Sequence, residues 1–403
     1  MEQAVYWLWF AGLFGRGTRL SHEMLEFYGS AEAVFEASEQ ELRQTALLTR
    51  ERIARVLRHD TDAAQRQYDE ALREGCRVLT PGDDEYPDCL RHIYAPPSAL
   101  FLRGSLSGLE ERPAIAVVGS RHSDEYGLTV ASRLSEELAA AGVSIVSGLA
   151  MGIDQAAHRA AIKAEGVTIG VLGCGIELDY PKGTRPLREL MTEKGAVLTE
   201  YPVGEPARPG NFPMRNRIIS GLSRGVLVAR ADEYSGSLIT AGHALSQGRD
   251  VFAVPGRIDE ALSRGTNKLL LQGAKPVTCA GDILEEYASV PSWGRNVPSQ
   301  VTPDPVRLRS GSRPRPQRKP AGQRSGLPAG PAACPDPPRR RAVPEYLSRR
   351  QADLLGQIGS QPVTAAQLAV QTGRPVGEIL SSLSELEIYG LIESHGPLGY
   401  TAL

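Results

Sequence analysis

The feature that most constrains the fold is a series of six short apolar runs between residues 76 and 290. They span residues 115–118, 143–146, 168–172, 196–199, 226–229 and 251–254, and Val277 marks the end of a candidate seventh. Each run has the length and the β-branched content of a buried strand. Helix-like segments such as residues 127–141 and 155–165 separate them. Buried strands that alternate with helices predict a parallel sheet covered on both faces, which is an α/β fold of the doubly wound, Rossmann-like type.

Residues 1–75 have a different pattern, which predicts a small helical domain. Helical segments are expected at residues 23–28, 31–36, 39–45 and 49–59, with Ser21, Ser30 and Ser38 as N-caps. The pattern resembles helix-hairpin-helix and sterile-alpha-motif modules, many of which bind DNA. This segment contains no lysine and mixes its arginines with many acids. A direct DNA contact and a docking or structural role therefore both stay open.

Residues 291–345 are predicted to be a disordered linker. They hold thirteen prolines, with eleven basic residues against three acidic ones, a net charge of +8. Such a composition buries too little apolar surface to fold. Loose attraction of phosphates and a merely solvated spacer are both compatible with it.

Residues 346–403 have the pattern of a winged-helix domain. Three helices are expected at residues 346–358, 365–372 and 376–389, followed by a two-stranded wing at 391–394 and 398–402. The third helix has no lysine or arginine and carries Glu378, Glu385 and Glu387. Because phosphate contacts need cations, docking to a protein is favoured over DNA-groove binding.

Two predicted strand ends carry small residues together with a cation. Gly119, Ser120 and Arg121 follow the first run, and Lys182 lies in the loop after the third. In a doubly wound fold, ligands bind beyond the carboxyl ends of the strands. Arg121 could clamp an anion with two hydrogen bonds, and Lys182 could contact one. A solvated surface charge stays an open alternative for both.

A further candidate site lies within residues 206–256. Ser235, Gly236 and Ser237 stand where a predicted strand ends and a helix begins, and free backbone N–H groups there can hold an anion. Just upstream the chain offers an aromatic face and two cations, which are Phe212, Arg215 and Arg217. An anion seat, a ring and guanidinium groups together predict a nucleotide or nucleic-acid ligand.

Several other classes of site are not supported by the motifs. Gly119 is not part of a GxGxxG sequence, which argues against NAD or FAD, and no cofactor is expected. Asp154 and His158 have helical i, i+4 spacing, but a helix cap and an ordinary polar contact are preferred to a catalytic dyad. Cys174 is interpreted as a packing residue. The five cysteines lack CxxC spacing, so neither a zinc site nor a disulfide framework is expected.

The compartment follows from the same composition. Scattered cysteines favour a reducing cytoplasm. The apolar patch at residues 6–10 is too short for a signal peptide, and no apolar run is long enough to span a bilayer. A cytoplasmic protein with no membrane contact is therefore expected.

Six motifs, taken in order, resemble the DprA/Smf family of DNA-processing proteins. They read VVGSR, SGLAMGIDQAAH, GCGIELDYP, FPMRNRIISGLS, SGSLITA and GRDVFAVPG, and SRGTNKLLLQGA follows. The resemblance covers residues 76–290. It implies an extended Rossmann domain that binds single-stranded DNA, helps to load RecA during natural transformation, and forms a homodimer through a surface near residues 269–273.

The resemblance also assigns roles to residues. Arg121 and Lys182 match basic residues of the DNA site, Phe212 would stack on a base, and the turn at residues 235–237 would hold phosphate. Arg215, Asn216 and Arg217 would line the same groove. One position departs from the pattern, because Arg230-Ala231 stands where the family usually has Glu-Ala. Arg230 could tune the pocket or contact a phosphate, and the sequence does not decide between them.

Two competing functions are weighed against DNA binding. Related Rossmann-type proteins of the lysine-decarboxylase-like group hydrolyse nucleoside monophosphates and use a carboxylate near this strand end. Here no acid follows the SGSLITA loop at the helix start, and residue 230 is an arginine, so the chain is not expected to be an enzyme. A scaffold without affinity for nucleic acid is the second alternative.

Overall fold

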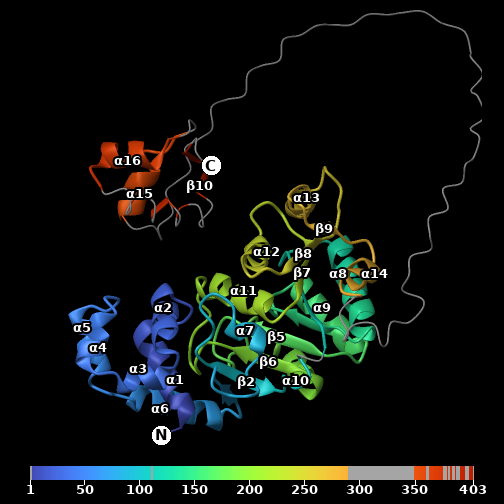
Figure 1. The fold of residues 1–403 in the computed structure, drawn as a ribbon. Coiled ribbons are helices and arrows are strands. Elements are labelled where there is room, and N and C mark those ends of the chain that lie inside the picture. The colour runs from blue at the N-terminus through green and yellow to red at the C-terminus, as the bar shows by residue number, and fades with distance from the viewer. Residues whose placement is uncertain are drawn as a thin grey trace, which may run out of the picture. The chain divides into compact units, whose positions relative to one another are not determined.

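The computed structural model of the 403-residue chain describes residues 2–109, 112–288 and, with short gaps, 349–402. By its internal contacts the chain divides into two compact units, Met1–Arg307 and Leu308–Leu403. Figure 1 shows the helices and strands of both. The predicted linker at residues 291–345 lies outside the described residues. Within them, no helix is both long enough and apolar enough to cross a membrane.

The first unit is built on a nine-stranded sheet with the order β1-β2-β6-β5-β4-β3-β7-β8-β9. Its strands are β1 (Arg77–Leu79), β2 (Leu100–Gly104), β3 (Ala114–Gly119), β4 (Ser144–Ser147), β5 (Thr168–Leu172), β6 (Ala196–Thr199), β7 (Gly225–Arg230), β8 (Asp250–Ala253) and β9 (Lys275–Pro276). From β6 to β9 all neighbours are parallel. This confirms the predicted doubly wound Rossmann-like arrangement.

Two strands at one edge make the sheet mixed rather than wholly parallel. β2 pairs antiparallel with β6, and β1 pairs antiparallel with β2. Neither strand was predicted. β1 has only three residues, and its first two are not fully buried, so it lacks a run that would stand out in the sequence. The six predicted strands are all present, and the fourth and third match the observed bounds of β6 and β5.

Helices cover both faces of the sheet. One face packs against α7 (Asp88–Arg91), α11 (Asn211–Gly221), α12 (Gly236–Ser246) and α13 (Arg264–Leu271). The other packs against α8 (Glu125–Ala140), α9 (Ile153–Lys163), α10 (Arg185–Lys194) and α14 (Ala280–Glu286). Alternate residues of β3 show the division, because Ile115 and Val117 face α8 and α9 while Ala116 and Val118 face α11. Strands buried on both faces explain the uninterrupted apolar runs.

Six helices precede the sheet: α1 (Gln3–Phe14), α2 (Arg19–Tyr28), α3 (Ala31–Glu36), α4 (Glu39–Gln44), α5 (Arg50–Val56) and α6 (Asp62–Arg73). Ser30 and Ser38 cap α3 and α4 as predicted, whereas α2 begins after Thr18 rather than at Ser21. These helices share one apolar cluster with the sheet, in which Phe10 of α1 joins Phe101, Leu172 and Met191.

The second unit contains α15 (Arg349–Leu355), α16 (Ala365–Thr372) and an antiparallel pair formed by β10 (Ile392–Ser394) and β11 (Tyr400–Ala402). Leu354, Leu368, Leu383 and Ile392 are among the buried residues of its own small core. Much of the predicted third helix lies outside the described residues. The helices and the hairpin are those expected of a winged helix.

Candidate functional site

A cavity of about 480 Å³ opens at the point where the strand order reverses. β3 is the first strand of the parallel series and has β4 on one side and β7 on the other. The loops that leave β3 and β7 therefore diverge, and a crevice remains between them. We call this cavity the switch-point pocket. Its lining includes Ser120, Arg121, Asp154, Tyr180, Phe212, Arg215, Asn216, Asp232, Ser235, Gly236 and Ser237.

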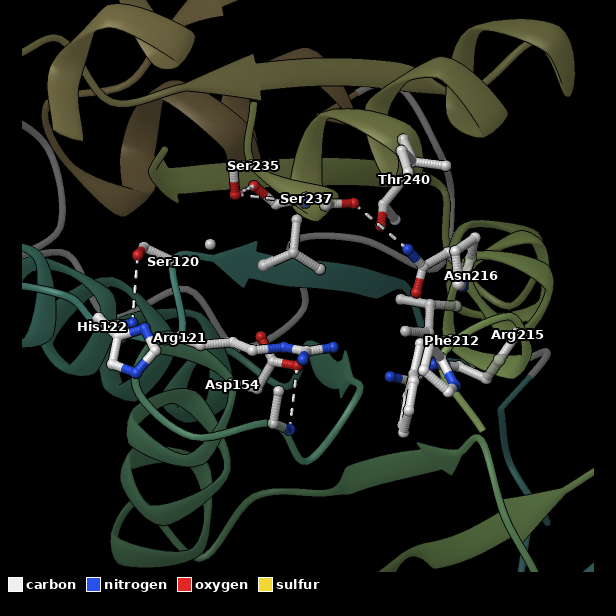
Figure 2. A pocket seen from close by; sticks show the side chains of 18 of the residues that line it. Ser120, Arg121, His122, Asp154, Phe212, Arg215, Asn216, Ser235, Ser237 and Thr240 are labelled. Carbon is white, nitrogen blue, oxygen red and sulfur yellow. Dashed lines mark hydrogen bonds between the residues drawn. The ribbon is translucent and has the colours of Figure 1, made fainter. Parts of the chain in front are cut away.

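An aromatic ring with two arginines forms one wall of the pocket. The guanidinium carbon of Arg121 lies 5.2 Å from the ring centroid of Phe212, and that of Arg215 lies 5.9 Å from it. Figure 2 shows Arg121 reaching across the pocket from the loop after β3 toward Phe212 on α11. Tyr180 adds a second ring, with 5.5 Å between the centroids. The wall offers a π-face and an exposed cation together.

Gly173 allows the ring of Phe212 to lie where it does. A Cβ atom at Gly173 would come within 2.8 Å of the ring, so any larger residue at this strand end would displace it. The structure shows that this glycine shapes the aromatic wall.

The opposite wall is the N-terminus of α12. Ser235 is the N-cap and its hydroxyl accepts a hydrogen bond from the Ser237 N–H at 3.4 Å. Gly236 is exposed, and a Cβ atom there would meet nothing within 4 Å. The first N–H groups of a helix have no partner within the helix and carry a partial positive charge. This wall can therefore hold an anion such as a phosphate.

Arg215 closes the floor of the pocket. Its side chain is 4% exposed and donates hydrogen bonds to the carbonyl oxygens of Gly148 (2.8 Å) and Val171. Gly148 has no room for a Cβ atom, which would come within 2.6 Å of this guanidinium. Burial lowers the pKa of Arg215 to about 10, so it stays charged at neutral pH. Arg215 lines the pocket as a fixed charge that two strand ends hold in place.

Asp154 places a carboxylate beside Arg215, which the sequence interpretation did not anticipate. Its Oδ2 accepts hydrogen bonds from the N–H groups of Gly148 (3.1 Å) and Ala150 (3.3 Å). The predicted helix cap is wrong, because Gly152 is the N-cap of α9 and no side chain caps it. Burial raises the pKa of Asp154 to about 6, although the charge of Arg215 opposes the shift. The charge of this carboxyl therefore changes in mildly acidic solution.

His158 does not form a dyad with Asp154. Its Nδ1 lies 2.7 Å from the hydroxyl of Thr168, and that hydroxyl donates to the Ile145 carbonyl. The hydroxyl must then accept from Nδ1–H, which leaves Nε2 unprotonated. Burial lowers the pKa of His158 to about 3, so the ring is neutral. The preference for an ordinary polar contact over a catalytic dyad agrees with this geometry.

Arg217 is separated from the pocket, although the sequence grouped it with Arg215. Its guanidinium donates to Glu200 at 2.7 Å and to the Ala95 carbonyl at 3.2 Å, and both members of the ion pair are almost fully buried. The turn between α1 and α2 lies against it, because a Cβ atom at Gly17 would come within 2.8 Å of Nη2. Arg217 joins α11 to the N-terminal helices. Its predicted place in the groove is wrong, since it does not line the pocket.

Lys182 is exposed and lies two residues beyond Tyr180, outside the pocket lining. The loop that carries it is fixed at several points. Arg188 donates to the carbonyl oxygens of Leu178 (2.7 Å) and Tyr180, and Asp179 accepts from the N–H groups of residues 183–185. Lys182 thus projects from a rigid loop on the Tyr180 side of the pocket.

Cys174 is buried, and burial raises the pKa of its thiol. A thiol that stays protonated is a poor nucleophile, which agrees with its interpretation as a packing residue. Across the residues that the structure describes, no group of three or more His, Cys, Asp or Glu side chains is placed to hold a metal ion.

Arg230 is buried and paired rather than available to a ligand. It is 1% exposed and forms ion pairs with Asp124 and, at 2.6 Å, with Glu260. Its hydrogen bonds to Asp124 lower the pKa of that carboxyl. Of the two roles left open, a direct phosphate contact does not fit this geometry.

The pocket also contains residues that the sequence interpretation missed, chiefly Asp154, Tyr180 and Asp232. All three follow predicted strands, so their position after a strand end was the available signal. The pocket and the fold together define a class of protein, which is the doubly wound α/β proteins with a ligand pocket at the topological switch point.

Comparisons with known proteins assign a family within this class. The family model described as DNA recombination-mediator protein A matches residues 77–288, and the DprA winged helix domain matches residues 327–396. Protein Smf of Synechocystis is 31% identical over 99% of this chain and 98% of its own length. DNA processing protein DprA of Bacillus subtilis is 45% identical over 54% of this chain and 73% of its own.

A solved structure agrees with these matches. DprA from Streptococcus pneumoniae superposes with a TM-score of 0.62 and 36% identity, over 71% of this chain and 99% of that one. The chain belongs to the DprA/Smf family of DNA-processing proteins. The resemblance drawn from the six motifs is confirmed, and so are the Rossmann-like fold and the C-terminal winged helix.

Proposed function

We propose that this protein binds single-stranded DNA in the switch-point pocket and promotes the loading of RecA on it during DNA uptake and homologous recombination. The observation that supports DNA binding is the facing pair of walls. Arg121 over Phe212 offers a cation and a ring, and the N-terminus of α12 offers an anion seat. A nucleotide needs both, because its base stacks and its phosphate is charged.

Single-stranded DNA suits this geometry better than a duplex. Phe212 is half-buried inside the pocket, so only a base that has left its stack can reach the ring. No array of base-reading side chains is needed, and stacking accepts every base. We therefore expect little sequence preference and a strong dependence on salt.

The proposal also covers the oligomeric state, the protein partner and the cellular compartment. We propose a homodimer whose surface lies near residues 269–273, where Leu271 is 90% exposed. RecA is the proposed protein partner, and the cytoplasm is the proposed compartment. The winged helix and the N-terminal helices are proposed to dock other proteins rather than to carry the DNA affinity. The boundaries at residues 75, 290 and 345 remain predictions.

The enzymatic alternative, hydrolysis of nucleoside monophosphates, has one observation in its favour, because Asp154 brings a carboxylate into the pocket. Two backbone N–H groups hold that carboxylate, and Arg215 lies beside it. This arrangement suits a structural charge better than a general acid. Release of a free base from nucleoside monophosphates, abolished by Asp154→Asn, would establish the alternative.

The test compares an oligothymidine strand with a duplex of equal length, for wild type and Arg121→Ala, at several salt concentrations. We expect the strand to bind more tightly, Arg121→Ala to weaken binding about tenfold, and the slope of log affinity against log salt to become shallower by about 0.7. RecA filament formation on coated DNA is the second readout.

Arg133→Ala is the matched control. Arg133 is an exposed arginine on α8 that pairs with Glu137 outside the pocket. It should bind like wild type. If Arg121→Ala also binds like wild type, the proposed site is wrong; if neither form of DNA binds, the scaffold alternative is favoured.

A further inference from the structure

Arg230 holds both ends of the short loop that carries Arg121. The loop runs from Ser120, just after β3, to Asp124, the N-cap of α8. At its start, the Ser120 N–H donates to the Arg230 carbonyl at 2.7 Å. At its end, the Arg230 Nε donates to the two carboxylate oxygens of Asp124 at 3.1 and 3.2 Å. One residue of β7 thus fixes the span of a loop that follows β3.

Close packing leaves the Arg230 side chain little freedom. Gly127 on the first turn of α8 has no room for a Cβ atom, which would come within 2.9 Å of the Arg230 Cγ. At Gly119 a Cβ atom would come within 2.8 Å of the Arg230 carbonyl oxygen. Both glycines therefore let β7 approach the loop closely. This close approach keeps the carbonyl and the guanidinium of Arg230 within hydrogen-bonding distance of the loop.

A second set of contacts fixes the guanidinium from the far side. Nη2 donates to Glu260 at 2.6 Å, and Nη1 donates to the hydroxyl of Ser263. Glu260 and Ser263 belong to the segment between β8 and α13. Because the planar guanidinium is bound to two carboxylates, it cannot rotate away from Asp124 without losing Glu260.

We infer that Arg230 is a positioning residue that sets Arg121 over Phe212, and so acts on DNA through Arg121 without touching it. This inference rests on the proposed function. Among the described residues no ion pair holds the exposed side chain of Arg121, so the backbone of its loop directs it across the pocket. Loss of the Arg230–Asp124 contact would let the loop move and would spread Arg121 over many orientations.

The test is a double-mutant cycle on strand affinity. Arg230→Met keeps the length of the side chain and removes its hydrogen bonds. We expect it to weaken binding about fivefold in the wild-type background and less than about twofold in the Arg121→Ala background, because its effect passes through Arg121. Arg230→Lys can pair with one carboxylate only, and we expect it to restore part of the loss.

Asp124→Ser is a second, milder variant that breaks the Arg230–Asp124 contact, and it serves in case Arg230→Met does not fold. Serine caps a helix about as well as aspartate, so α8 should keep its N-cap, but serine is too short to reach Arg230. We expect about a threefold loss of affinity with only a small fall in melting temperature, because Glu260 still pairs with Arg230. Asp259→Ser is the matched control, because it removes an exposed aspartate that pairs with Arg257 and not with Arg230.

The outcomes separate the inference from the function on which it rests. Equal losses for Arg230→Met in both backgrounds, or wild-type affinity for a folded Asp124→Ser, would show that Arg230 is only structural. If Arg121→Ala itself binds like wild type, the proposed DNA site is wrong, and the inference about Arg230 is wrong with it. A loss in Asp124→Ser that Asp259→Ser does not share supports the positioning role.

Discussion

Helix α11 presents Arg215 to the switch-point pocket and Arg217 to the N-terminal helices, and the two guanidinium groups meet different partners. Arg215 donates to the carbonyl oxygens of Gly148 and Val171, which orient it without cancelling its charge. Arg217 forms a buried ion pair with Glu200. Two arginines of the same helix, equally buried, therefore serve a ligand site in one case and internal packing in the other.

The difference shows that burial alone does not tell a structural cation from a functional one. What separates the two regions is the chemistry of the acceptor. On the pocket side, the nearby carboxyl of Asp154 has a pKa of about 6, and the exposed Arg121 adds a further positive charge. On the N-terminal side, one buried carboxylate balances one buried guanidinium. The following experiments test this division, from the largest expected effect to the smallest.

Arg217→Met should destabilise the protein most. It leaves Glu200 charged, buried and unpaired, which costs about 3 to 5 kcal/mol in the free energy of unfolding measured with denaturant. The folded protein should still bind a DNA strand within about twofold of wild type. Adding Glu200→Gln should recover part of the stability. A loss below about 1 kcal/mol would mean that the two regions do not differ as described.

Phe212→Ala should reduce binding by about 1 to 3 kcal/mol, because a base that stacks on the ring loses its platform. The measurement is strand affinity at constant salt. Phe27→Ala is the control, since Phe27 on α2 is 59% exposed and lies on the N-terminal side. If the two substitutions weaken strand binding equally, the pocket and the N-terminal helices do not differ in DNA binding.

Acidification from pH 7.5 to 5 should strengthen strand binding by about 1 kcal/mol. Below the pKa of about 6 the Asp154 carboxyl is neutral, so the charge of Arg215 is no longer opposed. In Asp154→Asn the affinity should be high at both pH values. The comparison is made in a His122→Gln background, because His122 also lines the pocket. A pH dependence that survives Asp154→Asn there contradicts the assignment.

The Asp154 carboxyl also makes the free energy of unfolding depend on pH, and its raised pKa fixes the direction of that dependence. A carboxyl whose folded pKa exceeds its unfolded value favours folding at low pH, and this contribution is lost as pH rises through about 6. Asp154→Asn should therefore flatten the pH dependence of the unfolding free energy between pH 4 and 7.

Lys182→Gln should have the smallest effect, at most about 0.5 kcal/mol, because its ammonium group is exposed and outside the pocket lining. A shallower salt slope is the sensitive readout. Lys163→Gln, whose lysine pairs with Glu136 on the surface, is the control. A loss as large as that of Phe212→Ala would mean that the DNA path runs over the Tyr180 loop.

The sheet was predictable because its central strands are buried on both faces. Thr168–Leu172 is wholly buried and reads as an apolar run in the sequence. Helix α1 was not recognised, since seven of its twelve residues are buried around its circumference and no periodic stripe results. The apolar patch at residues 6–10 is its centre.

The location of the site was predictable, and the wrong placement of Arg217 in the groove could have been avoided. Residues two apart on a helix point about 200° apart, so Arg215 and Arg217 could not both face one groove. The role of Arg230 could not be predicted, because Asp124 and Glu260 are distant in sequence and meet only through the pairing of β7 with β3 on one side and β8 on the other. Spatial neighbours of this kind leave no local pattern.

The apolar cluster that joins the N-terminal helices to the sheet has a consequence for folding. Phe10 lies in one continuous interior with Phe101 and Leu172, and the buried pair of Arg217 and Glu200 adjoins the turn at Gly17. A chain cut at residue 75 would uncover that interior. Residues 2–288 should therefore melt in a single cooperative transition, and amide hydrogens in α1 should exchange with solvent as slowly as those in β5.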